Sequence, residues 1–193
     1  MSTEDKYPNW FEQIAQYNFE HFLLPEAGKP DLNYLQLGVF TGDASKWLLD
    51  KVLTHKGSRL TDVDTWAGAD NEPVQEEMDF SDVYATYVNK VTHPNVHHYI
   101  MTTQEFLIHK RTNRYDFIYV DAHHTAASAF IDCELSWELL KSGGMLAVDD
   151  YEWVHPDGSL IHSPKLGITM FLDRHVGEYE TLAVNSQYWC RKH

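Results

Sequence analysis

The sequence predicts an α/β protein in which a mainly parallel sheet lies between two layers of helices. One observation predicts this fold class, and a second predicts that the chain forms a single domain. Short apolar runs alternate with amphipathic stretches along the chain, a pattern that produces parallel strands joined by helices on both faces of a sheet. The length of 193 residues is that of one ordinary domain. We therefore expect a single domain over residues 1–193, with a helical extension over residues 1–30 and the core over residues 31–193.

The first half of the chain predicts an amphipathic helix followed by alternating strands and helices. The helix is expected over residues 10–24, and its apolar face would contain Phe11, Ile14, Tyr17, Phe19 and Phe22. Strands are expected at residues 34–38, 59–64 and 96–101. Helices are expected at residues 44–53, with Asp43 as the cap, near residues 83–91, and at residues 104–110.

The second half predicts two buried strands, a last helix and a closing pair of strands. The buried strands span residues 115–120 and 145–148, and the helix between them is expected over residues 125–140 with a glycine stop at residues 143–144. Ser163 and Pro164 are typical of the N-cap and first position of a helix. Residues 179–184 and 188–191 are expected to pair antiparallel.

Composition excludes several classes of protein. The chain has 15 Lys and Arg against 29 Asp and Glu, a formal net charge of −14, which argues against nucleic acid as a partner because phosphate binding needs basic surface. Apolar runs are too short for a membrane span of roughly 18 residues, and the polar start is unlike a signal peptide. Two cysteines, Cys133 and Cys190, are typical of a reducing, cytoplasmic location.

The turn after the first strand indicates the kind of cofactor. A dinucleotide fingerprint would place glycine where Phe40 stands, so that backbone approaches a pyrophosphate, and the charge of Asp43 would repel phosphate at a helix N-terminus. The turn therefore suits a nucleoside without phosphates, of which S-adenosylmethionine is the commonest. Gly38 and Gly42 alone are more often a structural tight turn. Asp64, after the second strand, strengthens the cofactor interpretation because an acid there binds ribose hydroxyls.

Two alternatives remain for that ribose contact. Asp62 competes with Asp64 for the role, and Asp64 would otherwise be a solvated acid in a loop.

Three carboxylates follow two strands that are expected to be neighbours. Asp121 ends one strand, and Asp149 and Asp150 end the next. Converging like charges need a cation, raised pKa values or a substrate ammonium group. Oxygen ligands favour Mg²⁺, or Mn²⁺ or Ca²⁺, and such an ion would orient a substrate hydroxyl and lower its pKa. The alternative is that Asp149 or Asp150 caps the following turn.

Histidines and aromatic residues surround these acids in sequence. His124 has the ordinary pKa of a general base near neutrality, while His123 as a metal ligand would favour Mn, Fe or Zn. Both are otherwise polar residues of a surface loop. A further set, either pocket walls or ordinary packing residues, comprises Phe40, Trp66, Tyr151 and Trp153.

Together, four segments resemble the class I S-adenosylmethionine-dependent methyltransferases, and most closely the small proteins of methyltransferase family 24. The segments are residues 35–42 (LQLGVFTG), 63–66 (VDTW), 116–124 (DFIYVDAHH) and 141–151 (KSGGMLAVDDY). The resemblance covers about residues 8–191 and implies a Rossmann-like, seven-stranded sheet with an antiparallel last strand. It implies cofactor contacts from Gln36, Gly38, Phe40, Gly42, Asp64, Thr103, Gln104 and Asp121, with Thr103 and Gln104 at the adenine end.

The resemblance extends to the chemistry. Asp121, Asp149 and Asp150 look like the metal triad of metal-dependent O-methyltransferases, and His124 falls where those enzymes have a basic catalytic residue, beside Asp121. Gln36 departs from the family pattern, which has an acid for the methionine amino group, and a lower cofactor affinity is expected. Ala44 and His123 also replace commoner polar residues.

We therefore expect methyl transfer from S-adenosylmethionine to an oxygen of a small hydroxylated acceptor, assisted by Mg²⁺ or another divalent cation. The alternatives are a metal-independent enzyme that methylates an amine, a cofactor-binding protein without turnover, and a nicotinamide-dependent oxidoreductase, against which Phe40 and Asp43 argue.

Overall fold

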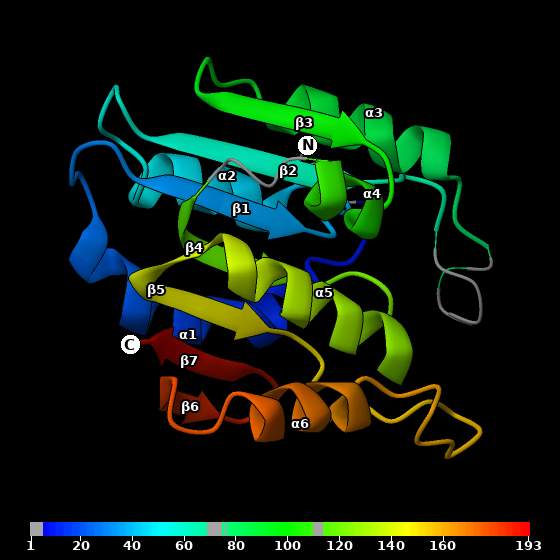
Figure 1. Ribbon diagram of the computed structural model, residues 1–193. Coiled ribbons are helices and arrows are strands. Elements are labelled where there is room, and N and C mark those ends of the chain that lie inside the picture. Colours follow the sequence, from blue (N-terminus) through cyan, green and yellow to red (C-terminus); the bar gives the residue numbers. More distant parts are fainter. Residues whose placement is uncertain (1–5, 69–74, 76, 110–113) are drawn as a thin grey trace.

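The computed structural model describes residues 6–68, 75, 77–109 and 114–193. Within these residues the chain forms a seven-stranded sheet with the order β3-β2-β1-β4-β5-β7-β6 (Figure 1). The strands are β1 (Asn33–Leu37), β2 (Arg59–Asp64), β3 (Val96–Ile100), β4 (Tyr115–Val120), β5 (Leu140–Val148), β6 (Tyr179–Val184) and β7 (Tyr188–Lys192).

Strand directions confirm the predicted sheet. β1 pairs parallel with both β2 and β4, and the parallel pairing continues to β3 on one side and β5 on the other. β7 pairs antiparallel with β5 and with β6, so the last strand runs against the others. The chain moves outward from β1 to β3 and then returns to β4, which makes the β1–β4 boundary a switch point where ligands bind beyond the strand ends.

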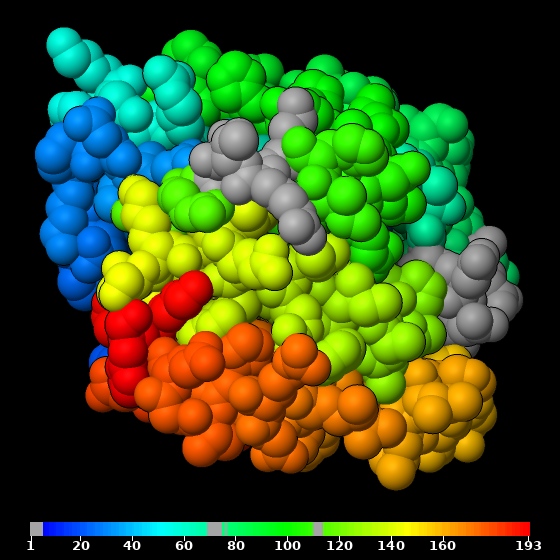
Figure 2. All heavy atoms as spheres, in the orientation of Figure 1, coloured from blue at the N-terminus to red at the C-terminus, as the bar shows by residue number. Residues whose placement is uncertain are grey.

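Helices cover both faces of the sheet (Figure 1). One face packs against η1 (Phe11–Ala15), α1 (Gln16–Leu23), α2 (Asp43–Lys51) and α3 (Phe80–Lys90), and the short η2 (Leu24–Glu26) follows α1. The other face packs against α4 (Thr103–His109), α5 (Ala126–Leu139) and α6 (Lys165–Arg174), the layer that faces the viewer in Figure 2. The three-layer arrangement follows from strands that are apolar on both faces.

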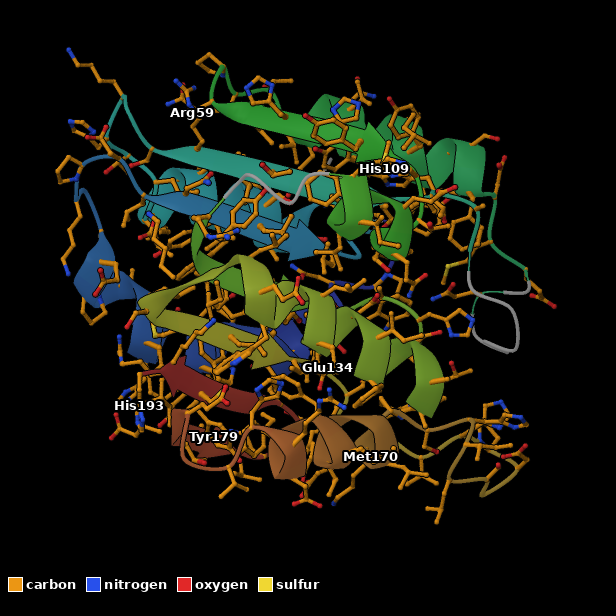
Figure 3. All side chains as sticks on the ribbon, in the orientation of Figure 1. Arg59, His109, Glu134, Met170, Tyr179 and His193 are labelled. Carbon is orange, nitrogen blue, oxygen red and sulfur yellow. The ribbon has the colours of Figure 1, made fainter. Side chains whose placement is uncertain are left out.

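Strand β4 shows how the two cores are separated. Phe117 and Tyr119 belong to the core beneath α1 and α2, while Ile118 and Val120 belong to the core beneath α5 and α6. Successive side chains of a strand point to opposite faces, so a continuous apolar run fills both cores, and side chains occupy the space between the layers (Figure 3). Cys133 and Cys190 are buried free thiols. Among the described residues, no helix combines the length and apolar character of a membrane span.

Three predicted helix ends are wrong. The N-cap of α2 is Gly42, whose positive φ of 81° turns the chain, and Asp43 is the first helical residue. No glycine stop ends α5: the backbone becomes extended at Leu140, and β5 runs on through Gly143 and Gly144. The hydroxyl of Ser163 does not cap α6, because it binds the loop before that helix.

The buried face of the N-terminal helix also differs from the apolar face that the sequence predicts. Phe19 is fully buried, whereas Tyr17 is 75% exposed. The segment begins with a π-helical turn at Phe11–Ala15, and the wider i to i+5 spacing of such a turn shifts the buried face relative to a regular α-helix. The chain then continues through Pro25 as the 3₁₀ turn η2.

Phe19 joins this N-terminal helix to the sheet, and its truncation should destabilise the fold. Its ring packs edge-on against Phe117, Tyr119 and Trp189 at centroid distances of 5.7, 4.9 and 5.4 Å. Because the site is fully buried, we expect Phe19→Ala to lower the free energy of unfolding by about 3–5 kcal/mol in urea titrations. Tyr17→Ala on the same helix should change it by less than about 0.5 kcal/mol, and equal effects would contradict this packing.

Candidate active site

A cavity of about 600 Å³ opens beyond the carboxyl ends of β1, β2, β4 and β5. Its walls come from the turns after these strands, from η1 and from the start of α4. The lining residues are Trp10, Phe11, Ile14, Gly38, Val39, Phe40, Asp64, Thr65, Trp66, Ala67, Gly68, Gln75, Phe80, Val83, Met101, Thr102, Thr103, Gln104, Tyr119, Asp121, Ala122, His123, His124, Ser128, Asp149, Asp150 and Trp153. The described cavity therefore lies where a switch-point ligand would bind.

Gly38 allows the first turn to touch the end of β4. It has a φ of 82°, and a Cβ at this position would lie 1.7 Å from the carbonyl oxygen of Asp121. The two strand ends are also joined by a hydrogen bond from the Asp121 amide to the Leu37 carbonyl, at 2.8 Å. No side chain fits between these backbones, which explains the glycine.

Asp64 fastens the same turn from the other side. Its Oδ2 accepts the amides of Val39 and Phe40 at 2.7 and 3.0 Å, and its Oδ1 accepts the amide of Trp66 at 2.8 Å. The turn amides that a pyrophosphate would need are thus already bonded to a carboxylate. This contact argues against a dinucleotide more strongly than the sequence did.

The predicted electrostatic role of Asp43 is weaker than expected. Its carboxylate accepts the Thr41 hydroxyl and the Lys90 ammonium, each at 2.7 Å, and it does not line the cavity. An ion pair with Lys90 offsets the charge that was expected to repel a phosphate.

Two aromatic residues in the left-handed region form a wall of the cavity. Phe40 and Trp66 have φ values of 53° and 46°, and the Trp66 indole donates to the Phe40 carbonyl at 2.9 Å. Trp10, before η1, packs on the Phe40 ring at 4.7 Å. Backbone conformations of this kind cost about 1–3 kcal/mol each and persist where surrounding structure holds them, here through Asp64 and the indole.

Gln36, Gly42 and Asp62 do not line the cavity, although the first two were predicted to contact the cofactor and Asp62 competed for the ribose. The Gln36 amide donates to the Gly38 carbonyl at 3.2 Å. Gly42 lies against Tyr87, which leaves no room for a Cβ. Asp62 is fully buried and accepts the Tyr87 hydroxyl at 2.9 Å, and burial raises its pKa to about 7. In this structure all three shape or support the turn.

Thr103 and Gln104, which the family resemblance places at the adenine end of the cofactor, line the cavity, and the structure adds a residue beneath them. Asp132 of α5 accepts the Thr103 hydroxyl at 2.8 Å and the Gln104 amide at 2.7 Å. Burial raises the pKa of Asp132 to about 6, against the effect of these two bonds. The sequence did not lead to a prediction for Asp132, because this residue lies within a mostly apolar helix. Its carboxyl group on the buried face of that helix is the feature that could have indicated a polar contact.

The strand-end acids converge in part as predicted. Asp121, Asp150 and His124 each offer a donor atom, and these atoms lie within 4.8 Å of one another. His124 Nε2 is 2.9 Å from Asp150 Oδ2, and its ring packs 5.0 Å from Trp153. Asp150 itself has a φ of 57°. All three residues line the cavity, so two carboxylates and an imidazole face the same space.

Asp149 differs from the prediction that it completes this set. Its Oδ1 accepts the amide of Asp150 at 2.9 Å, and its Oδ2 accepts the Tyr119 hydroxyl. Gln187 donates to that hydroxyl at 3.3 Å and accepts from Asn18 at 2.8 Å. A buried hydrogen-bonded chain therefore connects α1 to the acid cluster through Asp149, both of whose carboxylate oxygens accept hydrogen bonds.

The acids in this cluster are electrostatically crowded. Burial, with the charges of Asp149 and Asp150 next, raises the pKa of Asp121 well above its usual range, and nearby His124 acts in the opposite direction. Burial and the charge of Asp150 raise the pKa of Asp149 to about 6. A cation in this space would relieve the repulsion.

Some of the other predicted residues line the cavity, and others lie outside it. His123 lines the cavity, and its Nδ1 accepts the amide of Thr125 at 3.3 Å. Phe40, Trp66 and Trp153 are walls, whereas Tyr151 packs 5.4 Å from Tyr188 outside the lining. The N-terminal helical segment also contributes to the wall, through Trp10, Phe11 and Ile14. Lys110, the last residue of the helix predicted at residues 104–110, lies outside the described residues.

The parallel sheet with one reversed strand, and a cavity at its switch point, define the class I methyltransferase fold. The sequence profile of a family described as methyltransferase domain matches residues 35–151. The chain belongs to this family, and thus to the S-adenosylmethionine-dependent methyltransferases. No curated protein sequence matches the chain significantly.

Solved structures share the fold at low sequence identity. A protein from Clostridium thermocellum proposed to be an rRNA methylase is 12% identical, with a TM-score of 0.66 over 92% of this chain and 94% of that one. The methyltransferase MycE of mycinamycin biosynthesis is 14% identical, with a TM-score of 0.64 over 97% of this chain and 51% of its own. The O-methyltransferase TomG from Streptomyces achromogenes is 16% identical, with a TM-score of 0.57 over 88% and 74%.

Gly38→Ala should disrupt the cavity and Gly143→Ala should not. The two glycines have φ values of 82° and 78°, but only Gly38 has backbone where a Cβ would stand. The left-handed conformation costs about 1–2 kcal/mol for a residue with a Cβ, and Gly143→Ala should lose only that. We expect Gly38→Ala to lose more and also to lose binding of S-adenosylhomocysteine by calorimetry. Equal losses in both variants would contradict the close approach.

Asp62→Asn should make stability less dependent on pH. The Asp62 pKa is about 7 in the fold against an ordinary 3.8, so between pH 4 and 7 the native state binds more protons than the unfolded state. The free energy of unfolding therefore falls as pH rises through this window. In urea titrations at several pH values, Asp62→Asn should reduce this fall, whereas Asp173→Asn, at an exposed position, should leave it unchanged. An unaltered slope in Asp62→Asn would contradict the assignment.

Proposed function

We propose that this methyltransferase methylates an oxygen atom of a small hydroxylated acceptor, with a divalent cation bound by Asp121 and Asp150. The observation that carries the proposal is the convergence of Asp121, Asp150 and His124 within 4.8 Å on one wall of the cavity. The cofactor would occupy the part of the cavity formed by Gly38, Asp64 and Gln104, because each of these lies on it.

The donor set fits a divalent cation. Two carboxylates with room for water are typical of Mg²⁺ sites, and the same oxygen ligands also suit Mn²⁺. The crowding of Asp121, Asp149 and Asp150 favours added positive charge. MycE, which has the same fold, binds Mg and S-adenosylhomocysteine together with mycinamycin VI. A cation held here would supply Lewis acidity, which lowers the pKa of an acceptor hydroxyl.

The residues of the chain supply proton transfer and orientation. His124 takes the proton of the acceptor hydroxyl, and Asp150, 2.9 Å from its Nε2, stabilises the imidazolium that forms. Asp149 and Tyr119 position the backbone of Asp150 through their hydrogen bonds. Most of the acceleration would come from holding the acceptor oxygen in line with the sulfonium methyl group.

A small molecule suits this cavity better than RNA. The net charge is −14, and three carboxylates line the cavity at the end of β4 and β5, so a phosphate backbone would be repelled. Phe40, Trp66 and Trp153 offer apolar walls for the body of an acceptor. The neighbours that act on RNA share only the fold with this chain.

Removal of metal separates the proposed mechanism from its rivals. We expect turnover to be lost in a chelator and restored by Mg²⁺ or Mn²⁺, as measured by formation of S-adenosylhomocysteine with a panel of hydroxylated acceptors. Unchanged turnover would instead favour a metal-independent enzyme that methylates an amine, with the same carboxylates binding the amine acceptor. Cofactor binding without turnover on hydroxylated and amine panels would favour a binding protein.

Asp150→Asn should abolish turnover and keep cofactor binding. Asparagine tolerates the left-handed backbone that Asp150 adopts at φ 57°, so the variant removes charge without adding strain. We expect turnover to fall at least about a hundredfold, while the affinity for S-adenosylhomocysteine changes little in calorimetry. The control is Asp173→Asn, at an exposed position of α6, which should turn over normally; normal turnover in Asp150→Asn would sink the assigned role.

A further inference from the structure

A second group of metal-ligating side chains lies in the loop between β5 and α6, at the lower right of Figure 1. His155, Asp157 and His162 each offer one donor atom, and the three atoms lie within 4.8 Å of one another. None of the three lines the methyltransferase cavity. This group, the loop cluster, is therefore separate from Asp121, Asp150 and His124.

The loop cluster has the geometry of a partly formed coordination site. His155 Nδ1 lies 2.7 Å from Asp157 Oδ1, and His162 Nδ1 lies 2.6 Å from Asp157 Oδ2. Ligands of tetrahedral Zn²⁺ at 2.0–2.2 Å are about 3.3 Å apart, so each imidazole nitrogen would move about 0.6–0.7 Å from the carboxylate oxygen that it contacts. The ion would take the place of the Asp157 amide, from which His155 Nδ1 accepts a hydrogen bond at 3.2 Å. The two rings are 5.3 Å apart and steeply inclined, so they converge on the carboxylate from different directions.

Backbone contacts hold the donors in place before any ion arrives. The His155 amide donates to the Ser163 hydroxyl at 3.0 Å, and that hydroxyl donates to the Ser159 carbonyl at 2.8 Å. The Ser159 amide donates to Asp157 Oδ1 at 2.7 Å. Ser163 is buried and closes the loop between His155 and His162. Ligands held in this way lose little conformational entropy when a metal binds.

The donor types select the class of metal. Two imidazole nitrogens and one carboxylate oxygen suit borderline transition metals, and Mg²⁺ and Ca²⁺ prefer all-oxygen sites. Three protein ligands with the fourth position left to water is a common zinc arrangement. Asp157 and His162 are both about two-fifths exposed, which gives an ion and its water access from solvent.

The loop cluster is connected to the cavity through Trp153. The Trp153 ring lies 5.8 Å from the His155 ring and 5.0 Å from the His124 ring, and it lines the cavity. Fixing His155 would therefore also fix one wall of the methyltransferase cavity.

We propose that His155, Asp157 and His162 bind a Zn²⁺ ion, which pins the β5–α6 loop and the Trp153 wall that it carries. The site is independent of the cation proposed at Asp121 and Asp150. Zn²⁺ at this position leaves one coordination place for water.

The test measures Zn²⁺ alone in a chain whose cavity cluster is disabled. Protein carrying Asp150→Asn is stripped with chelator and dialysed against Zn²⁺ at micromolar concentration, and bound metal is measured by atomic spectrometry. We expect one Zn²⁺ per chain and a rise in Tm. Adding His162→Ala or Asp157→Asn should weaken binding at least about tenfold, because loss of even an outer partner of a ligand costs 10–100-fold, and the rise in Tm should disappear.

His97→Ala in the same background is the matched control, because His97 is an exposed histidine on β3 and its removal should leave Zn²⁺ binding unchanged. Circular dichroism confirms that each variant is folded. The proposal is overturned if the Asp150→Asn chain binds no Zn²⁺ at these concentrations. In that case the contacts between Asp157 and the two histidines only stabilise the loop. It is equally overturned if binding survives both His162→Ala and Asp157→Asn.

Discussion

The cavity depends on the close approach of two backbones, at Gly38 after β1 and Asp121 after β4. The Cβ that Gly38 lacks would overlap the Asp121 carbonyl oxygen, so the turn that lines the cavity touches the strand end that carries Asp121. Asp64 secures the other side of the turn by accepting its amides. At the proposed position over Gly38, a cofactor would therefore lie beside the acid cluster, and methyl transfer needs its two reactants to be held close together.

The second constraint is the accumulation of buried acids around that contact. Asp121, Asp149 and Asp150 crowd the ends of β4 and β5, and a buried chain of polar groups from α1 stabilises Asp149 through Tyr119. His124 faces Asp150. All three acids line the cavity, but their hydrogen bonds differ: both oxygens of Asp149 accept hydrogen bonds from Asp150 and Tyr119, while Asp121 and Asp150 converge with His124. Asp150 is therefore a more direct position than Asp149 at which to remove a proposed metal ligand.

Much of the fold was predictable because strand formation here is local. The mostly apolar run of β4 contains its own burial signal on both faces, and the predicted bounds of β2 and β4 match the structure. Helix ends were less predictable, because Ser163 and Gly143 have residue types typical of caps but serve a loop and a strand. The face of the N-terminal helix was displaced by a π-helical turn, which apolar spacing alone does not reveal.

By itself, the sequence determined the order of strands and helices and the positions of the strand-end acids. It also determined the family of the chain, since all of these depend on residue type and spacing along the chain. Only the tertiary structure decided which atoms meet. It placed Asp62, Gln36 and Gly42 outside the cavity lining and added Asp132 beneath Gln104. It also brought His124, rather than Asp149, into the donor set with Asp121 and Asp150. The reason is physical: a carboxylate faces a cavity or a hydrogen-bond donor according to a rotation of its side chain, and neighbours distant in sequence decide that rotation.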